Sequence, residues 1–162
     1  MILEKTTILN WLENVSDPEI TNVSIKDMGI LRDVIVTENN NVEVVITPTY
    51  SGCPAMDMIA MQIRMVLLGH EVKNIKITHQ LQPAWTSDWI TEKGKQNMLA
   101  LGIAPPNRKA SDGFKDFEDD RIPCPKCGSE HTELISQFGA TSCKAMYRCL
   151  DCKEPFEHFK CH

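Results

Sequence analysis

The sequence has no long apolar run. No stretch of its 162 residues approaches the roughly 18 consecutive apolar positions that a membrane-spanning helix requires. The first residues, MILEKTTILNWLENVSD, also lack the basic head and apolar core of a secretion signal. These absences exclude a membrane protein, and we expect a cytoplasmic chain whose 42% hydrophobic content suffices for a globular core.

An excess of positive charge is missing as well. The 17 Lys and Arg residues are outnumbered by 22 Asp and Glu residues, which leaves a formal net charge of -5. A negative chain has no general attraction for nucleic-acid phosphates or for anionic lipid surfaces. The charge therefore favours proteins as partners, with no nucleic acid and no membrane among them.

Cysteine is plentiful, but its distribution does not suit a secreted disulfide scaffold. Four of the seven cysteines form two Cys-x-x-Cys pairs, whereas Cys53 stands alone far upstream. Paired cysteines at this short spacing are typical of metal sites and thiol chemistry in a reducing compartment.

Residues 1–82 predict a small α+β domain. Apolar residues recur at helical spacing in two segments, and β-branched residues are frequent in three others. The run Asn39-Asn40-Asn41 tolerates a tight turn, so the first two strands are expected to pair as a hairpin. The expected elements, in the order α-β-β-α-β, cover Lys5 to Val15, Leu31 to Thr37, Val42 to Thr47, Ala55 to Leu68 and Val72 to His79.

Residues 83–107 begin with PAWTSDWI and continue in a helical pattern. Thr86 or Ser87 can cap a helix that runs to Leu101, before GIAPP ends it. Trp85 and Trp89 are four residues apart and would share one face of this helix. We predict a helical extension whose two tryptophans offer a surface to a partner.

An acidic segment poor in apolar residues follows this extension. RKASDGFKDFEDD, from Arg108 to Asp120, combines five acids with three bases. Such a composition cannot bury enough surface to fold alone. We predict a linker over residues 108–123 that joins two separately folding parts, the second being residues 124–162.

This C-terminal part has the spacing of a zinc ribbon. The 21 residues between the two Cys-x-x-Cys pairs leave room for strands over Thr132 to Ser136 and Ala145 to Arg148. Gly128 permits the left-handed backbone after the first pair, whereas the second pair is followed by Lys153. About forty residues give too little core, so structural zinc, worth roughly 10–16 kcal/mol in apparent free energy, is expected to hold the fold. The predicted ligands are Cys124, Cys127, Cys149 and Cys152.

Two alternatives to zinc remain for these cysteines. Four cysteinates at similar spacing also hold a single iron in electron carriers, and geometry alone separates the two metals poorly. Unligated thiols or two disulfides are the other alternative, although paired Cys-x-x-Cys turns at this separation favour a metal.

Cys53 precedes the helix predicted from Ala55, and Pro54 suits the first position of such a helix. A thiol at a helix N-terminus is stabilised as the thiolate, the reactive and metal-binding form. Cys53 is therefore a candidate reactive thiol, with a buried structural cysteine as the alternative. The helix itself carries a second apolar face of Met58, Met61, Met65 and Leu68, for which we expect core packing in preference to partner binding.

The first domain resembles the MIP18-like or DUF59 family, whose members assist iron-sulfur cluster assembly. The matching motifs are Asp17-Pro-Glu-Ile20, Asp27-Met-Gly29 and the loop that contains Cys53. By this resemblance, Cys53 and Asp17 are candidates for metal transfer, with iron or an iron-sulfur cluster as a transient cargo.

The whole chain resembles a narrower family, the D subunit of the phenylacetyl-CoA 1,2-epoxidase complex of aerobic phenylacetate breakdown. The added motifs are Pro83 to Ile90, Gly102 to Pro106, the cysteine ribbon and Glu154-Pro-Phe156. In that family a di-iron oxygenase subunit and a flavin and iron-sulfur reductase carry out the ring epoxidation.

The sequence lacks both the paired Glu-x-x-His motifs of a di-iron bundle and a G-x-G-x-x-G dinucleotide turn. The resemblance therefore implies an accessory subunit without catalytic residues, whose partners are the iron-sulfur reductase or the di-iron oxygenase. A homo-oligomer is compatible with this interpretation. A docking subunit and a rubredoxin-like electron carrier remain as alternatives.

Overall fold

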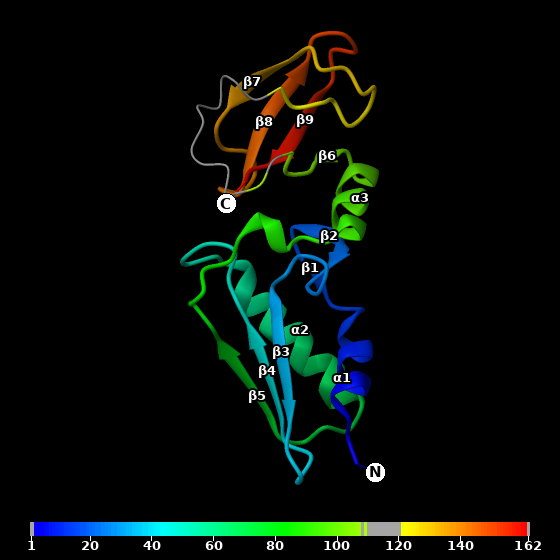
Figure 1. Ribbon diagram of the computed structural model, residues 1–162, viewed down its shortest axis with the longest axis vertical. Helices are drawn as coiled ribbons and strands as arrows, with labels where there is room; N and C mark the ends of the chain where they lie inside the picture. The colour runs from blue at the N-terminus through cyan, green and yellow to red at the C-terminus, as the bar shows by residue number, and fades with distance from the viewer. Residues whose placement is uncertain (1, 108, 110–120, 162) are drawn as a thin grey trace. The chain divides into compact units, whose positions relative to one another are not determined.

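The computed structural model describes residues 2–107, 109 and 121–161. The chain divides into two compact units, one ending at Trp85 and the other beginning at Thr86. Both units combine helices with β-strands, which confirms the predicted α+β class (Figure 1). Within the described residues, no helix has the length and apolar character needed to cross a membrane.

A mixed three-stranded sheet forms the centre of the first unit. Strands β3 (Leu31–Val36) and β4 (Val42–Ile46) are antiparallel, as the predicted hairpin requires. Strand β5 (Ile75–His79) pairs with β4 in parallel. Because parallel neighbours need a crossover, helix α2 (Ala55–Gly69) connects β4 to β5 and packs on one face of the sheet (Figure 1).

A short helix and a small hairpin precede this sheet. Helix α1 (Lys5–Leu12) ends earlier than predicted. Strands β1 (Ser16–Asp17) and β2 (Ile20–Ser24) then form a two-stranded hairpin that the sequence did not predict. Helix α1 contacts α2, and the ring of Trp11 stacks on His70 at a centroid distance of 3.9 Å.

The core of the first unit lies between its sheet and its helices. Alternate residues of β4 and every third or fourth residue of α2 contribute to it, as their periodicities predict. The fully buried members from these elements and from α1 are Ile8, Leu12, Val44, Ile46, Ile59, Ile63 and Leu67.

The second face of α2 does not join this core. Met58, Met61, Met65 and Leu68 are all exposed, so the expectation of core packing for this face is wrong. The sheet and α1 cover only the opposite side of the helix, because a three-stranded sheet provides one packing layer.

The second unit begins with two short helices, where the sequence predicted one. A 3-10 helix, η1 (Ser87–Trp89), is capped by Thr86, whose hydroxyl accepts the Asp88 N–H at 3.3 Å. Ile90 then adopts extended backbone with ψ 127°. Helix α3 (Glu92–Ala100) starts afresh at Thr91, whose hydroxyl accepts the Gly94 N–H at 3.0 Å.

A four-stranded sheet makes up the rest of this unit, in the order β6-β9-β8-β7. Strand β7 (Thr132–Ser136) is as predicted, and β8 (Lys144–Cys149) is slightly longer than predicted. Strand β9 (Pro155–Phe159) pairs antiparallel with β8, and β6 (Ile103–Ala104) pairs with β9 in parallel. Neither β9 nor β6 was expected from the sequence.

Strand β6 places residues 86–107 in the same unit as the ribbon, instead of in a separate extension. The division after Trp85 lies close to the predicted boundary at residue 82. Most of the predicted linker, 108–123, lies outside the described residues. The core of this unit gathers side chains from both sides of that segment: Ala104, Ile122, Cys124, Ala145, Tyr147, Cys149 and Phe156.

A buried ion pair reinforces the β8–β9 pairing. The Lys144 ammonium lies 3.2 Å from the Glu157 carboxylate, and the Lys144 side chain is almost wholly buried. A Cβ at Gly139 would lie 2.9 Å from the same carboxylate. The residue that covers this ion pair therefore has to be glycine.

Candidate metal centre and cysteine loop

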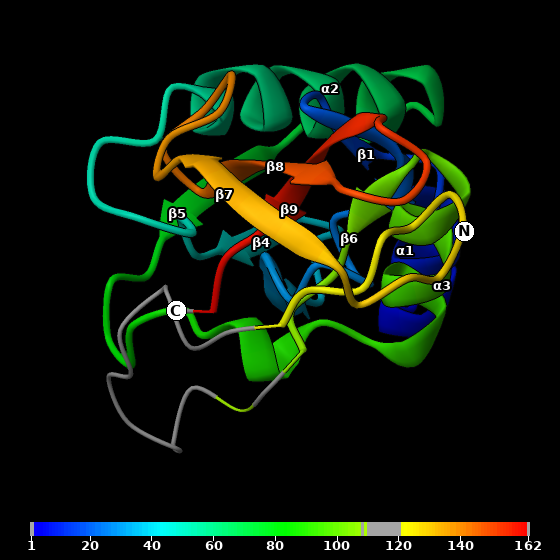
Figure 2. The same cartoon turned by 90° about the horizontal axis from the view of Figure 1, so that it is seen from above.

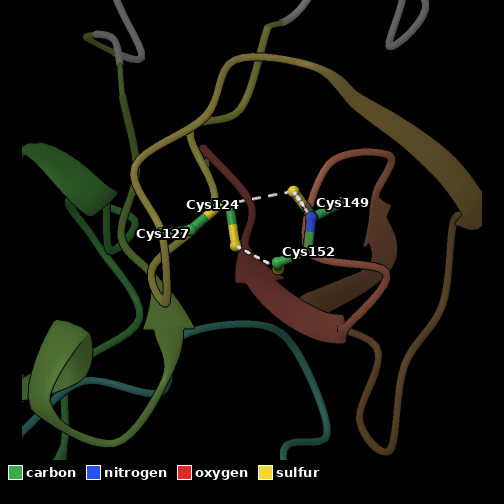
Figure 3. Close-up of side chains that lie close together, drawn as sticks. All are labelled: Cys124, Cys127, Cys149 and Cys152. Atoms are coloured by element: carbon green, nitrogen blue, oxygen red, sulfur yellow. Dashed lines mark hydrogen bonds between the residues drawn. The ribbon is translucent and has the colours of Figure 1, made fainter.

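The four predicted ligands meet in one cluster at the end of the β7–β9 sheet. The Sγ atoms of Cys124, Cys127, Cys149 and Cys152 all lie within 4.8 Å of one another (Figure 3). Across the two turns, Cys124 Sγ lies 3.8 Å from Cys152 Sγ, and Cys127 Sγ lies 3.5 Å from Cys149 Sγ. The fold therefore brings together the two pairs that the sequence separates.

Two turns of similar backbone hold the sulfurs. Each turn reverses the chain through a left-handed residue, Gly128 with φ 77° and Lys153 with φ 65°. Backbone amides point at the sulfurs: Lys126 N–H donates to Cys124 at 3.4 Å, and Cys152 N–H donates to Cys149 at 3.5 Å. Such bonds stabilise the negative charge of a metal-bound thiolate.

The geometry of the cluster fits a tetrahedral metal ion. Zinc bonds thiolate sulfur at about 2.3 Å, which places the sulfurs of a regular tetrahedron about 3.8 Å apart. The two distances between the turns agree with that value. Cys124 and Cys149 are buried, whereas Cys127 and Cys152 lie at the surface. A closed set of four sulfurs leaves no open coordination position, as is typical of a structural site.

The close sulfurs share protons when no metal is bound. The Cys152 amide, which donates to Cys149, lowers the pKa of Cys149 to about 7. The Ser129 amide favours the Cys127 thiolate, but the Cys149 sulfur, burial and the other two thiols together raise the pKa of Cys127 to about 12. A metal ion must therefore displace protons from this cluster, which makes its binding dependent on pH.

Neighbouring polar residues have their own partners. His131 Nδ1 lies 3.6 Å from the Asp151 carboxylate, and Ser129 donates a short hydrogen bond to the same residue. Buried His158 contacts the Ala104 carbonyl through Nδ1 at 3.0 Å. In the described residues the metal-binding group is formed by the four cysteines, without either histidine.

Cys53 lies in the first unit, in the loop between β4 and α2. Gly52 before it has φ 77°, a conformation that glycine adopts without strain, and Pro54 caps α2. The Cys53 side chain is partly exposed, and the Thr49 hydroxyl lies 3.9 Å from its Sγ. The loop therefore presents the thiol at the start of α2, where the sequence predicted it.

Asp17 is part of the turn between β1 and β2. Its side chain is buried, and Oδ1 accepts the Glu19 N–H at 2.7 Å. Within the described residues, neither Asp17 nor Cys53 belongs to a group of three or more potential metal ligands. The observed bond gives Asp17 a role in closing its own turn.

The tryptophans do not form the predicted shared surface. Trp85 is 5% exposed, and its indole N–H donates to the Met28 carbonyl at 2.9 Å. Trp89 is half-buried and belongs to η1 in the other unit. The expectation of one helical face was wrong because the helix is broken at Ile90. Trp85 instead fixes the chain after β5 to the Asp27-Met-Gly29 turn, where Gly29 has φ 73°.

Comparison with known proteins agrees with both units. Residues 5–77 match the family model described as an iron-sulfur cluster assembly protein, and residues 108–160 match the PaaD zinc beta ribbon domain. The fold and the cysteine cluster thus define an iron-sulfur assembly domain joined to a zinc-ribbon domain. The chain is 41% identical to a protein of Escherichia coli (strain K12) named as the D subunit of 1,2-phenylacetyl-CoA epoxidase, over 93% of this chain and 88% of that protein. It belongs to this family of epoxidase D subunits, as its motifs predicted.

Other similar proteins match the first unit. An Fe-S protein maturation auxiliary factor of Porphyromonas gingivalis is 36% identical over 59% of this chain and 89% of its own length. A crystal structure of a DUF59 domain from Bacillus anthracis superimposes with a TM-score of 0.53 at 30% identity, covering 60% of this chain and 90% of that one. The resemblance to the DUF59 family is therefore confirmed.

Proposed function

We propose that this chain is an accessory subunit of a phenylacetyl-CoA 1,2-epoxidase system and helps to assemble or deliver an iron or iron-sulfur centre there. It has no catalytic step of its own in this proposal. The observation that carries the proposal is the position of Cys53, a partly exposed thiol in a glycine-containing loop of the unit that matches the assembly family.

The chemistry of the loop supports a transfer role. A thiolate is a soft ligand that suits iron and iron-sulfur clusters. A single protein ligand holds a metal weakly, which favours release to a client over permanent binding. Gly52 leaves the approach to Cys53 open, since no heavy atom lies within 4 Å of the point where its Cβ would be. The partners would be the iron-sulfur reductase or the di-iron oxygenase.

Zinc in the ribbon is proposed as a structural cofactor. The closed set of four sulfurs and their tetrahedral spacing support it. Cys124, Cys127, Cys149 and Cys152 would hold the ion, which supplies folding free energy to a unit with a small core. A purified chain that is colourless and contains one zinc per chain would exclude the iron-based electron carrier.

The transfer role is tested by Cys53→Ser in a reconstituted epoxidase system. We expect the iron content of the reductase or the oxygenase, and with it phenylacetyl-CoA turnover, to fall about tenfold or more, as loss of a metal-handling group typically does. The variant should keep its fold and its ribbon zinc, because Cys53 lies in the other unit.

Ser51→Ala is the matched control, because Ser51 is an exposed residue of the same loop that carries no thiol. It should leave iron content and turnover unchanged. Undiminished values for Cys53→Ser would remove the transfer role and favour a docking subunit.

A further inference from the structure

The exposed face of α2 forms a continuous apolar stripe. Met58, Met61, Met65 and Leu68 are 45%, 51%, 66% and 58% exposed, respectively. Their spacing of three, four and three residues places them along one side of the helix, as in the seam of a coiled coil. In Figure 2 the strands of the same unit lie on one side of α2 only. We refer to these four residues as the methionine stripe.

Such a stripe differs from the usual exposure of single apolar residues. Isolated apolar side chains are common on protein surfaces, but a contiguous row along a helix marks an interaction site. Methionine is flexible and polarisable, so it adapts to an opposing apolar surface. The composition of the stripe therefore suits packing against another helix.

Two opposite charges lie along one edge of the stripe. Asp57 and Arg64 are seven residues apart, which is two helical turns, so both occupy the same side of the helix. Both are exposed. The Arg64 guanidinium donates one hydrogen bond to the Ile75 carbonyl at 3.3 Å, which fixes its orientation and leaves further donors available. The edge thus has a negative first half and a positive second half.

We propose that the methionine stripe is covered by the same stripe of a second copy of this chain, with the two α2 helices antiparallel. A two-fold axis near Met61 then places Met58 of one copy against Met65 of the other. Because the axis reverses the helix direction, Asp57 of each copy comes beside Arg64 of the other. Parallel helices would place like charges together, so the charge pattern selects the antiparallel arrangement.

The oligomeric state of the zinc-loaded full chain tests this dimer. Sedimentation velocity over about 1–100 µM should show a monomer–dimer equilibrium, the range expected for a modest interface. Met61→Lys and Met65→Lys should each yield monomers whose thermal unfolding is unchanged, because both side chains are exposed in the monomer. Leu81→Lys, at a residue 63% exposed outside α2, is the matched control and should still dimerise.

Charge reversal tests the antiparallel register. Asp57→Arg and Arg64→Asp should each raise the dimer dissociation constant about tenfold, because each places like charges side by side twice. The double variant should return the constant to near its original value, since the pairs are then exchanged and not lost. A double variant that stays as weak as the single ones would contradict the antiparallel pairing.

Two other results would overturn the dimer itself. One is a chain that remains monomeric at the highest concentration, and the other is a dimer that Met65→Lys does not weaken. If Met65→Lys weakens only the association with another epoxidase subunit, the stripe has a different occupant. These results are independent of the role proposed for Cys53, whose variants should dimerise normally.

Discussion

The two metal-binding turns share a backbone conformation but differ in the residue that adopts its left-handed position. Gly128 adopts φ 77° without strain, whereas Lys153 adopts φ 65° with a Cβ. An L-residue in this region loses roughly 1–2 kcal/mol relative to its preferred conformations. The second turn is therefore strained, and the sequence departs from the ideal ribbon pattern at the same residue.

This difference predicts opposite effects of two substitutions. Gly128→Ala should lower the free energy of unfolding of the zinc-loaded ribbon unit by about 1 kcal/mol, and Lys153→Gly should raise it by up to about 1 kcal/mol. Urea unfolding monitored by an NMR signal of the second unit measures both. Lys153→Gln keeps the Cβ but removes the charge, so it should have little effect. A Lys153→Gln variant as stable as Lys153→Gly would assign the gain to charge.

At the residue scale, local spacing carried most of the predictable information. The sequence predicted that Cys124, Cys127, Cys149 and Cys152 would meet, because each turn positions two sulfurs by itself. The position of Cys53 before α2 also followed from a local loop and helix pattern. The burial of Trp85 was not predictable, because its partner, the Met28 carbonyl, is 57 residues away.

Strand β6 is the element that changes the organisation of the chain. It is two residues long and pairs with β9 in parallel, so residues before the predicted linker complete the ribbon sheet. The His158 contact with the Ala104 carbonyl adds a side-chain link at the same point. The ribbon unit is thus built from segments on both sides of residues 108–120.

Limited proteolysis should reveal this shared construction. We expect cleavage between residues 108 and 120, where the composition favours accessible chain. The two fragments should nevertheless co-elute on size exclusion, because β6 remains paired with β9. Addition of a chelator or of denaturant should then separate them. Fragments that separate under native conditions would show that the β6–β9 pairing is too weak to hold the unit together.

Elements with a clear period were predictable, and very short ones were not. The strands and the long helix of the first unit followed from alternation and helical spacing. Strands of two residues, such as β1 and β6, show no period, and parallel pairing between distant segments leaves no local signal. The methionine stripe was misassigned because periodicity identifies an apolar face without showing what covers it.

At the scale of the whole molecule, the two units depend on different sources of stability. The first unit has an extensive core of fully buried aliphatic residues. The second unit has a small core of which two members, Cys124 and Cys149, are also metal ligands. Loss of the metal removes charge neutralisation from inside that core.

Metal removal should therefore unfold one unit and spare the other. Treatment with a strong chelator should collapse the NMR signals of residues 86–161 while those of residues 2–85 persist. Cys127→Ser should produce the same selective loss without a chelator, since serine is a poor zinc ligand. Elemental analysis should find one zinc per chain before treatment. Full metal content in Cys127→Ser would contradict the four-cysteine assignment.

The burial of Ala104 and Ile122 in one hydrophobic cluster has a practical consequence. The chain leaves the second unit after β6 and returns to the same unit, so the intervening residues do not span a distance between folded parts. Each doubling of the length of such a loop adds only about 0.6 kcal/mol of closure entropy. Residues 108–120 are therefore a suitable place to insert an epitope or a fluorescent reporter, which would follow the protein in living cells while both chain ends stay unmodified.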